Sequence, residues 1–489
     1  MTLRKIALIA VGIPLVAAIF SCNSDYESTV ATASSAVVRS FTLTRDDSVL
    51  AHLDSVYFSI DLAKGLIFNA DSLPYGTRVK RLIPVISMLE TASVMELRVK
   101  RANGTDTVYN YLTNSTDSID FTNPVDLRVV SFDGLTEFHY TITVNVHKMV
   151  ADSLTWSEAN RSLLPTSLSN PTAQRTAKQG DTFYCLTTDG SDFCMASCTP
   201  TARTKNGPLM LPEAWTNRTV SFPFEPDVES FSATDDALYI LSAADGELYE
   251  STDAGNSWVS TSKRWHSVYG RYGEELIGSV ETATGWMMES YPGGRSVAIP
   301  ASMPVEGASM PIGFNFPMSG AEQIVMVGGR TADGSLSSAA WGFDGTSWVS
   351  LSKTALPVAL ENVAVAMYYS FTVSNSWNVK TYPTLMAFGG IDAEGNLNDA
   401  VYRSSDYGYI WRKAPAVMQM PSYMPAVSGA QTFVVESTYT ADVQPKIAKP
   451  TESWECPYIY MFGGYDADGK LQNALWRGVI NRMTFAPIE

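Results

Sequence analysis

The stretch FGGIDAEGNLNDAVYRSSDYGYIW, residues 388–411, combines two local patterns. An apolar strand ends in Gly389 and Gly390, and an acidic turn follows before an aromatic residue, Tyr402. The second half, SSDYGYIW, carries serine, aspartate, glycine and tryptophan at fixed spacing. Paired glycines permit left-handed backbone or the close approach of another segment, and acidic residues before glycine favour hairpin turns. The stretch therefore predicts a unit of short antiparallel strands.

Similar turns recur along the C-terminal part of the chain. They read ADGEL at 244–248, ADGSL at 332–336, AEGNL at 393–397 and ADGKL at 467–471, with looser copies TDGSDF at 188 and TGWMM at 284. Six copies predict six four-stranded blades of a β-propeller, because each repeated unit buries its core against its neighbours. The expected blades are 178–224, 229–262, 265–302, 305–353, 356–416 and 420–489.

Three of these units align without a gap and resemble the kelch repeat. In each unit two glycines close an apolar strand, and an aromatic residue follows twelve positions after the second glycine. In one unit, six residues separate that aromatic residue from a tryptophan. The structural residues expected from this pattern are Gly328, Gly329, Trp341, Trp348, Gly389, Gly390, Tyr402, Gly463, Gly464 and Trp476.

Two units carry STDAGNSW and SSDYGYIW, which resemble the Asp-box of sialidases. In such a turn the aspartate accepts backbone N–H groups, the glycine takes a conformation that a side chain would hinder, and the tryptophan packs beneath. Sialidase Asp-boxes lie away from the active site, so the resemblance implies a scaffold role. The structural residues expected from it are Ser251, Asp253, Gly255, Trp258, Ser404, Asp406, Gly408 and Trp411.

Residues 36–150 predict an immunoglobulin-like β-sandwich of about seven strands, which makes the whole chain all-β. The segments are AVVRSFTLT, SVYFSIDL, GLIFNA, VKRLIPVIS, MELRVK, VDLRVVSF and FHYTITVNVHK. Residues 151–177 are rich in Ser, Thr, Asn and Pro and predict a linker, whose early part is a candidate strand.

The N-terminus predicts a secretory signal over residues 1–21, with Arg4 and Lys5 before an apolar run. Ser21 before Cys22 resembles a bacterial lipobox, which implies that Cys22 is acylated and that residues 22–35 form a tether. The sandwich segment SIDLAKGLIFNADSLPYGTRVKRLIPVI and the propeller repeats together resemble two-module Bacteroides lipoproteins of unknown function. The resemblance implies an outer-membrane lipoprotein on the cell surface or the periplasmic face.

Composition narrows the range of partners and cofactors. The net charge of −16 argues against nucleic acid or an anionic membrane surface as a partner. The four histidines are scattered and show no zinc spacing. After Cys22, four cysteines remain, and their disulfide pairing is open: Cys185, Cys194, Cys198 and Cys456.

Turn acids are the candidates for ligand contact at one rim of the propeller. The sequence DADG at 466–469 resembles part of a calcium loop, but Gly469 already accounts for the tight turn, and no cofactor is expected. Aromatic and acidic side chains together suit a glycan or a protein ligand. The candidate rim residues are Asp333, Asp392, Glu394, Asp466 and Asp468.

A catalytic set is not recognisable in the sequence. A sialidase would need an arginine triad, a tyrosine nucleophile with a glutamate, and an aspartate acid/base, and the Arg-Ile-Pro before its first blade is missing here. Arg330, Arg403 and Arg477 recur near the repeats and are interpreted as exposed solvating charge. We therefore expect a non-catalytic binding module for a glycan or a protein. The alternatives are a glycan-active hydrolase or lyase with a divergent sialidase-like propeller, and a structural subunit of a surface complex.

Overall fold

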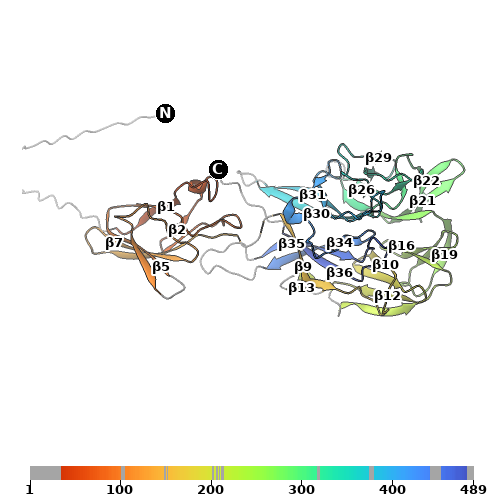
Figure 1. The fold of residues 1–489 in the computed structure, drawn as a ribbon, viewed down its shortest axis with the longest axis horizontal. Helices are drawn as coiled ribbons and strands as arrows, with labels where there is room; N and C mark the ends of the chain where they lie inside the picture. The colour runs from red at the N-terminus through yellow and green to blue at the C-terminus, as the bar shows by residue number, and fades with distance from the viewer. Residues whose placement is uncertain are drawn as a thin grey trace, which may run out of the picture.

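The structure is a computed structural model that describes residues 35–100, 105–147, 150, 152–200, 203–204, 207–208, 210, 214–316, 320–373, 379–440 and 453–481. The expected signal peptide and Cys22 lie outside these residues. Figure 1 shows two β-rich bodies, an N-terminal one and a larger C-terminal one. Helical structure in the described ranges is limited to single 3₁₀ turns such as η1 (Leu53–Ser55) and η3 (Ala416–Met418). Within those ranges, no helix is long and apolar enough to span a membrane.

The N-terminal body is built on a six-stranded sheet in the order β2-β3-β8-β7-β5-β6. Its strands pair antiparallel except β3 and β8, which run parallel. A separate two-stranded sheet joins β1 to β4. The strands are β1 (Val38–Leu43), β2 (Ser59–Asp61), β3 (Leu66–Phe68), β4 (Pro84–Met88), β5 (Ala92–Lys100), β6 (Asp106–Asn110), β7 (Val125–Ser131) and β8 (Glu137–Thr143).

One face of the six-stranded sheet forms the core of this body. Leu97, Leu127 and Tyr140 are aligned across β5, β7 and β8 and are buried together with Phe41 from β1. Side chains alternate between the two faces of a strand, so the neighbouring residues face outward. Those outward residues include Arg128, which pairs with Glu96 and Glu137. The sequence-predicted strands are all present, and β6 is an additional strand that the sequence did not indicate.

The C-terminal body contains six four-stranded antiparallel sheets, numbered one to six in chain order. Sheets one to three are β10 (Ala173–Gln179), β11 (Thr182–Thr188), β12 (Phe193–Cys198) and β15 (Thr216–Val220); β16 (Pro226–Ala233), β17 (Leu238–Ser242), β18 (Glu247–Ser251) and β19 (Val259–Arg264); and β20 (Ser267–Tyr272), β21 (Glu275–Thr282), β22 (Gly285–Tyr291) and β23 (Ser296–Ala298).

Sheets four and five follow the same pattern of four consecutive main strands. They are β25 (Ile312–Asn315), β26 (Glu322–Val327), β28 (Ala340–Phe343) and β29 (Trp348–Ser350), then β30 (Ala364–Val373), β31 (Val379–Phe388), β32 (Tyr402–Ser404) and β33 (Arg412–Lys413). Two short ladders lie outside the sheets: β13 (Arg203–Thr204) with β14 (Gly207–Pro208), and β24 (Pro304–Glu306) with β27 (Arg330–Thr331).

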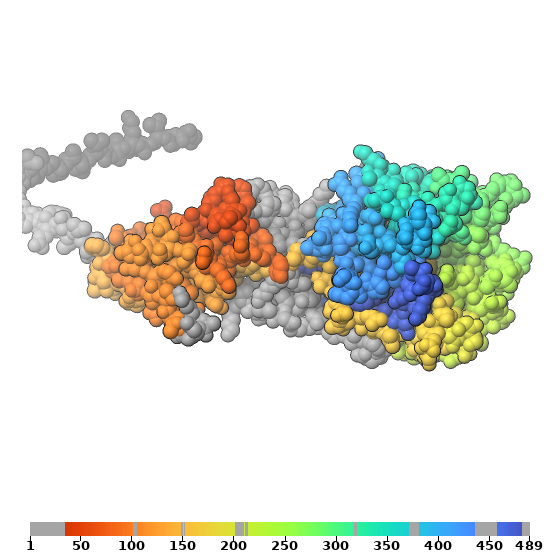
Figure 2. All heavy atoms as spheres, in the orientation of Figure 1, coloured from red at the N-terminus to blue at the C-terminus, as the bar shows by residue number. Residues whose placement is uncertain are grey.

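Sheet six takes its outer strand from the beginning of the C-terminal body. It consists of β34 (Gln431–Thr440), β35 (Ser453–Phe462), β36 (Leu475–Asn481) and β9 (Ser153–Ser162), in that order. In Figure 2 the dark blue C-terminal residues lie against the yellow residues from the beginning of this body. The expected linker 151–177 contains β9, in the early part that was a candidate strand, and the start of β10. Leu154 and Trp156 are the buried apolar residues of β9. Because this outer strand buries so few side chains, its sequence is mostly polar.

Apolar clusters join consecutive sheets throughout this body. Leu186 of sheet one packs with Ile240 of sheet two, and equivalent clusters join sheet two to three, three to four, four to five and five to six. A further cluster joins Phe462 of sheet six to Phe183 of sheet one. The first strands of neighbouring sheets also lie side by side, as β10 and β16 do. Each sheet thus buries both faces against its neighbours.

Candidate functional site

The two sequence-predicted Asp-boxes have the same geometry. In sheet two, Asp253 Oδ1 accepts hydrogen bonds from Ser251 Oγ at 2.8 Å and from the backbone N–H groups of Asn256 and Ser257 at 3.0 and 2.9 Å. The Gly255 N–H donates to Ser251 Oγ at 2.7 Å, and Gly255 has a φ of 82°. The Ser257 hydroxyl also donates to Asp253 Oδ2 at 2.6 Å, and this bond is the largest cause that lowers the pKa of Asp253 to about 2.

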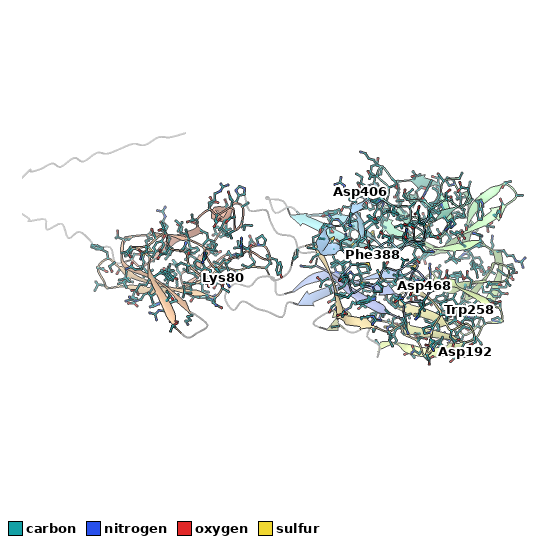
Figure 3. All side chains as sticks on the ribbon, viewed as in Figure 1. Lys80, Asp192, Trp258, Phe388, Asp406 and Asp468 are labelled. Atoms are coloured by element: carbon teal, nitrogen blue, oxygen red, sulfur yellow. The ribbon has the colours of Figure 1, made fainter. Side chains whose placement is uncertain are left out.

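In sheet five, Ser404 donates to Asp406 Oδ1 at 2.7 Å, and the Gly408 N–H donates to Ser404 Oγ at 3.0 Å. The tryptophans that end the boxes, Trp258 and Trp411, are buried. Figure 3 shows Trp258 and Asp406, from different boxes, in separate parts of the C-terminal body. The two boxes therefore do not converge on one site.

Each Asp-box also contacts the sheet that precedes it. Arg218 of β15 donates to the carbonyl oxygen of Ala254 and, at 2.6 Å, to Asn256 Oδ1. A side chain added at Gly408 would meet Ala340 of sheet four at 3.2 Å. The boxes therefore stabilise the contact between neighbouring sheets, which is a scaffold function.

The kelch-like glycines make the turns between second and third strands. All six have positive φ, and a Cβ added at Gly389 would lie 2.0 Å from the Val427 carbonyl oxygen. The Gly390 N–H donates to that same oxygen at 3.0 Å. Close approach between consecutive sheets thus requires glycine here. The aromatic residues of the pattern are all buried: Trp341, Trp348, Tyr402 and Trp476.

The candidate rim acids follow these glycines and are mostly engaged within their own turns. Asp392 Oδ1 accepts from the Asn396 N–H at 2.8 Å, Asp466 Oδ1 accepts from the Lys470 N–H at 2.9 Å, and Asp333 Oδ1 accepts from the Ser335 N–H at 3.0 Å. Glu394 and Asp468 are exposed. Bonds of this kind shape the turns that carry these acids.

The structure instead brings together a polar group that the sequence did not indicate. The Arg175 cluster consists of Gln174 and Arg175 of β10, Asp227 and Glu229 of β16, and Tyr465 after β35. Ala173 near the start of β10 pairs with Thr188 at the end of β11, and Asp227 near the start of β16 pairs with Leu241 near the end of β17. The first strands of sheets one and two therefore begin at the end of the sheet where the second strand leads into its turn. Tyr465 follows the glycine turn of sheet six at the equivalent end.

Arg175 Nε and Gln174 Oε1 are buried and have no hydrogen-bond partner among the described residues. The buried Tyr465 hydroxyl lies close enough to the Glu229 side chain and the Gln174 backbone for both to act on its pKa. Burial lowers the pKa of Arg175, and the charges of Glu229, Tyr465 and Asp227 act against that shift. Burial raises the pKa of Asp227, and burial with the neighbouring Glu229 raises that of Tyr465. Buried polar groups are almost always satisfied by protein or water, but other buried polar atoms of the described residues also lack a partner, the indole nitrogens of Trp258 and Trp411 among them.

Arg330 and Arg403 are paired with carboxylates, whereas Arg175 and Arg477 are not. Arg330 pairs with Glu361 at 2.6 Å, Arg403 pairs with Asp152 at 2.8 Å, and Arg477 donates to Asn160 at 2.7 Å. Their interpretation as exposed solvating charge is therefore wrong, since each bonds to a partner distant in sequence. Arg175, like Arg477, forms no ion pair within 4.0 Å among the described residues.

Cysteine and histidine chemistry does not contribute a second site in the described ranges. Cys185, Cys194 and Cys198 are free and buried. Cys185 stands opposite Ala196 in the β11–β12 ladder, so the other two cysteines are diagonal neighbours, too far for a strain-free disulfide. Cys456 lies in a stretch whose side chains are not described. No group of three His, Cys, Asp or Glu side chains in the described ranges is arranged to hold a metal ion.

Two family models match the chain. The DUF6242 beta propeller domain matches residues 150–488, and the N-terminal domain of the same family, a domain of unknown function, matches residues 28–144. Among curated proteins, nothing matches the chain. The matches confirm the expected two-module organisation and assign the C-terminal body to the β-propellers.

Proposed function

The chain belongs to the DUF6242 family, and from this premise we propose that it is a lipid-anchored envelope protein whose propeller is a non-catalytic binding module. The Arg175 cluster supports the proposal, because it gathers charged and polar side chains of sheets one, two and six at one end of the propeller, where Glu229 is exposed. A glycan is the favoured ligand class, since sugars offer many hydroxyl groups to such a cluster.

The architecture that we propose for this function is finer than the family match. The six sheets are the six blades of one propeller, supported by apolar clusters that join each sheet to the next and sheet six to sheet one. The N-terminal body is an immunoglobulin-like β-sandwich, supported by its buried core between β1–β4 and the larger sheet. β9 closes the ring by completing the last blade.

The test is a screen of the lipid-free mature chain against host and dietary glycans, with binding and turnover measured in the same samples. Binding without turnover is the expected result. Turnover that a single carboxylate substitution abolishes would refute the non-catalytic assignment. If neither binding nor turnover is detected, a glycan ligand is excluded and a protein partner remains, which co-purification would identify.

One observation favours a hydrolase as the second candidate. Tyr465 and Glu229 are neighbours beside Arg175, and a sialidase-like mechanism uses a tyrosine, a glutamate and arginines. Only one arginine is present in the cluster, and the raised pKa of Tyr465 disfavours the phenolate. If the chain does hydrolyse a glycan, Tyr465→Phe should abolish turnover while leaving the fold intact.

The lipid anchor has its own test. We propose that Cys22 is acylated and attaches the protein to the outer membrane, on the basis of the apolar run and Ser21 before Cys22. Cys22→Ala should move the protein from the membrane fraction to the soluble fraction. Unchanged membrane retention of this variant would refute the anchor and would leave the binding proposal intact.

A further inference from the structure

Three large side chains without any polar atom are exposed at one end of the N-terminal body. The hairpin between β7 and β8 carries Phe132, which is 62% exposed, and Leu135, which is 84% exposed. The turn between β4 and β5 carries Leu89, which is 58% exposed. We call these three residues the apolar end. Single exposed apolar side chains are common, whereas a group of them marks a contact with another protein or with a membrane.

Strand pairing places the two turns at the same end of the body. Ala92 at the start of β5 pairs with Ser131 at the end of β7, and Ser93 Oγ donates to the Ser131 carbonyl oxygen at 2.6 Å. Leu89 is three residues before Ala92, and Phe132 directly follows Ser131. The two turns therefore present their apolar side chains together.

The first described residues of the chain lie at this end as well. The Leu89 N–H donates to the Val37 carbonyl oxygen at 2.9 Å. From Cys22 to Ser35 the chain has thirteen peptide steps, which span at most about 45 Å when fully extended. A lipid on Cys22 would therefore keep the apolar end within that distance of the bilayer.

The chain continues towards the propeller from the opposite end of the body. β8 runs from Glu137, next to the hairpin, to Thr143, and beyond it Val146 pairs with Leu73. Tyr75, two residues after Leu73, is 56% exposed at that opposite end. The apolar end thus points away from the connection to the propeller, so the propeller does not have to be displaced for a bilayer to reach it.

The hairpin carries a charged group between its two apolar side chains. Asp133 Oδ1 accepts hydrogen bonds from the Ser131 hydroxyl at 2.6 Å and from the Leu135 N–H at 3.0 Å. The bond from Ser131 is the largest cause that lowers the pKa of Asp133, so this carboxylate stays ionised at neutral pH. A charge is costly inside the hydrocarbon of a bilayer. The hairpin therefore suits the headgroup layer and not deep insertion.

Resting on the proposed lipid anchor, we propose that the apolar end of the N-terminal body lies against a zwitterionic phospholipid surface beside the anchor. Leu89, Phe132 and Leu135 then lie at the boundary between the headgroups and the acyl chains. The anchor confines the body near the bilayer, so the contact is intramolecular and a small apolar surface suffices. An anionic surface fits less well, because it repels Asp133 and the exposed Glu90 of the second turn.

The experiment measures co-sedimentation of the lipid-free mature chain with phosphatidylcholine vesicles at millimolar lipid concentration. The parent chain should bind, and the double substitution Phe132→Ser, Leu135→Ser should lower its partition constant about tenfold. Tyr75→Ser is the matched control, since it removes a similarly exposed side chain from the opposite end, and should bind like the parent. The chain used carries no lipid, so vesicle binding does not depend on acylation of Cys22.

Stability measurements keep the variants interpretable. Substitutions at exposed positions change stability little, so the double variant should melt at the temperature of the parent. A clearly lower melting temperature would show that these side chains pack within the body and would overturn the assignment. Leu89→Ser, in the other turn, provides a second reading and should lower the partition constant about threefold.

The remaining outcomes separate the membrane contact from the lipid anchor. No binding of the parent to phosphatidylcholine vesicles, binding only to phosphatidylglycerol vesicles, or binding that the double variant retains would each overturn this inference. If Cys22→Ala is released from membranes and the parent does not bind vesicles, the anchor stands and the contact is refuted. If Cys22→Ala is retained and the double substitution abolishes vesicle binding, the anchor is refuted and the contact of the apolar end is supported.

Discussion

Arg403 donates a hydrogen bond of 2.8 Å to Asp152, although 251 residues separate them. Asp152 directly precedes β9, the strand that completes sheet six, and Arg403 lies on β32 of sheet five. The Tyr368 hydroxyl also donates to Asp152, at 3.3 Å. Both donors lie on sheet five, so this contact ties the residue before β9 of sheet six to sheet five.

We expect Arg403→Met to destabilise the C-terminal body modestly, by about 0.5–1 kcal/mol, since the pair is partly exposed and solvent screens it. Urea unfolding of Arg403→Met, Asp152→Asn and the double variant measures the coupling between the two side chains. If the losses in unfolding free energy of the two single variants add up to that of the double variant, the interaction between the two side chains contributes nothing to stability.

Trp411 should be the most costly Asp-box residue to remove. The side chain is 1% exposed and packs with residues of sheets four and five. Trp411→Ala should lower the free energy of unfolding by about 3–5 kcal/mol because it leaves a cavity. Tyr409→Ala, two residues earlier and 48% exposed, is the control and should change it by less than about 0.5 kcal/mol.

Alanine substitutions at two glycines of sheet five distinguish the cost of backbone strain from the cost of steric overlap. Gly395 has a φ of 83° with no atom within 4 Å of an added Cβ, so Gly395→Ala should cost only about 1 kcal/mol. Gly389 has a φ of 60°, and its added Cβ would overlap the Val427 carbonyl oxygen. Gly389→Ala should therefore cost clearly more. Equal losses in chemical denaturation would show that the sheets tolerate separation at this turn.

The ionisation of the Asp253 carboxyl group should make the stability of the folded chain depend on pH in the acid range. Its pKa is about 2 in the folded chain against an ordinary value of 3.8, so its contribution is complete above 3.8 and is lost as the pH falls through about 2. The melting temperature should fall between pH 5 and pH 2, and Asp253→Asn should remove the part of this fall that comes from Asp253. Asp236→Asn is the control, since the Asp236 carboxylate accepts no hydrogen bond among the described residues. An unchanged pH profile for Asp253→Asn would contradict the assignment.

The three described cysteines should resist alkylation in the native chain. Burial raises the pKa of Cys185 to about 12 and that of Cys198 to about 11, so the reactive thiolate is scarce at neutral pH. Peptide mass spectrometry after iodoacetamide treatment should find Cys185, Cys194 and Cys198 modified only after denaturation. Rapid native modification would mean that sheet one opens to solvent.

Local sequence patterns were sufficient to predict the turns and most of the strands that make up each sheet. The glycine pairs, the Asp-boxes and the acidic turns are determined within a few residues, because their hydrogen bonds close inside one hairpin, as those of Asp253 and Asp392 do. Alternating apolar residues likewise indicated β8 and its neighbours. The edge strand β6 was missed because its residues are exposed or only half-buried, which leaves little apolar alternation.

Tertiary structure alone decided how the units meet. The sequence indicated β9 only as a candidate strand within the expected linker, because its outer position buries few side chains, yet it pairs with β36 more than 300 residues later. The Arg175 cluster draws its side chains from sheets one, two and six, and Arg175 itself lies in the unremarkable stretch TAQRTAKQ. Sequence therefore determined the repeat and its turns, which depend on short-range bonds. The pairing of β9 with β36 and the Arg175 cluster depend on contacts between distant strands, which form only when the sheets pack together.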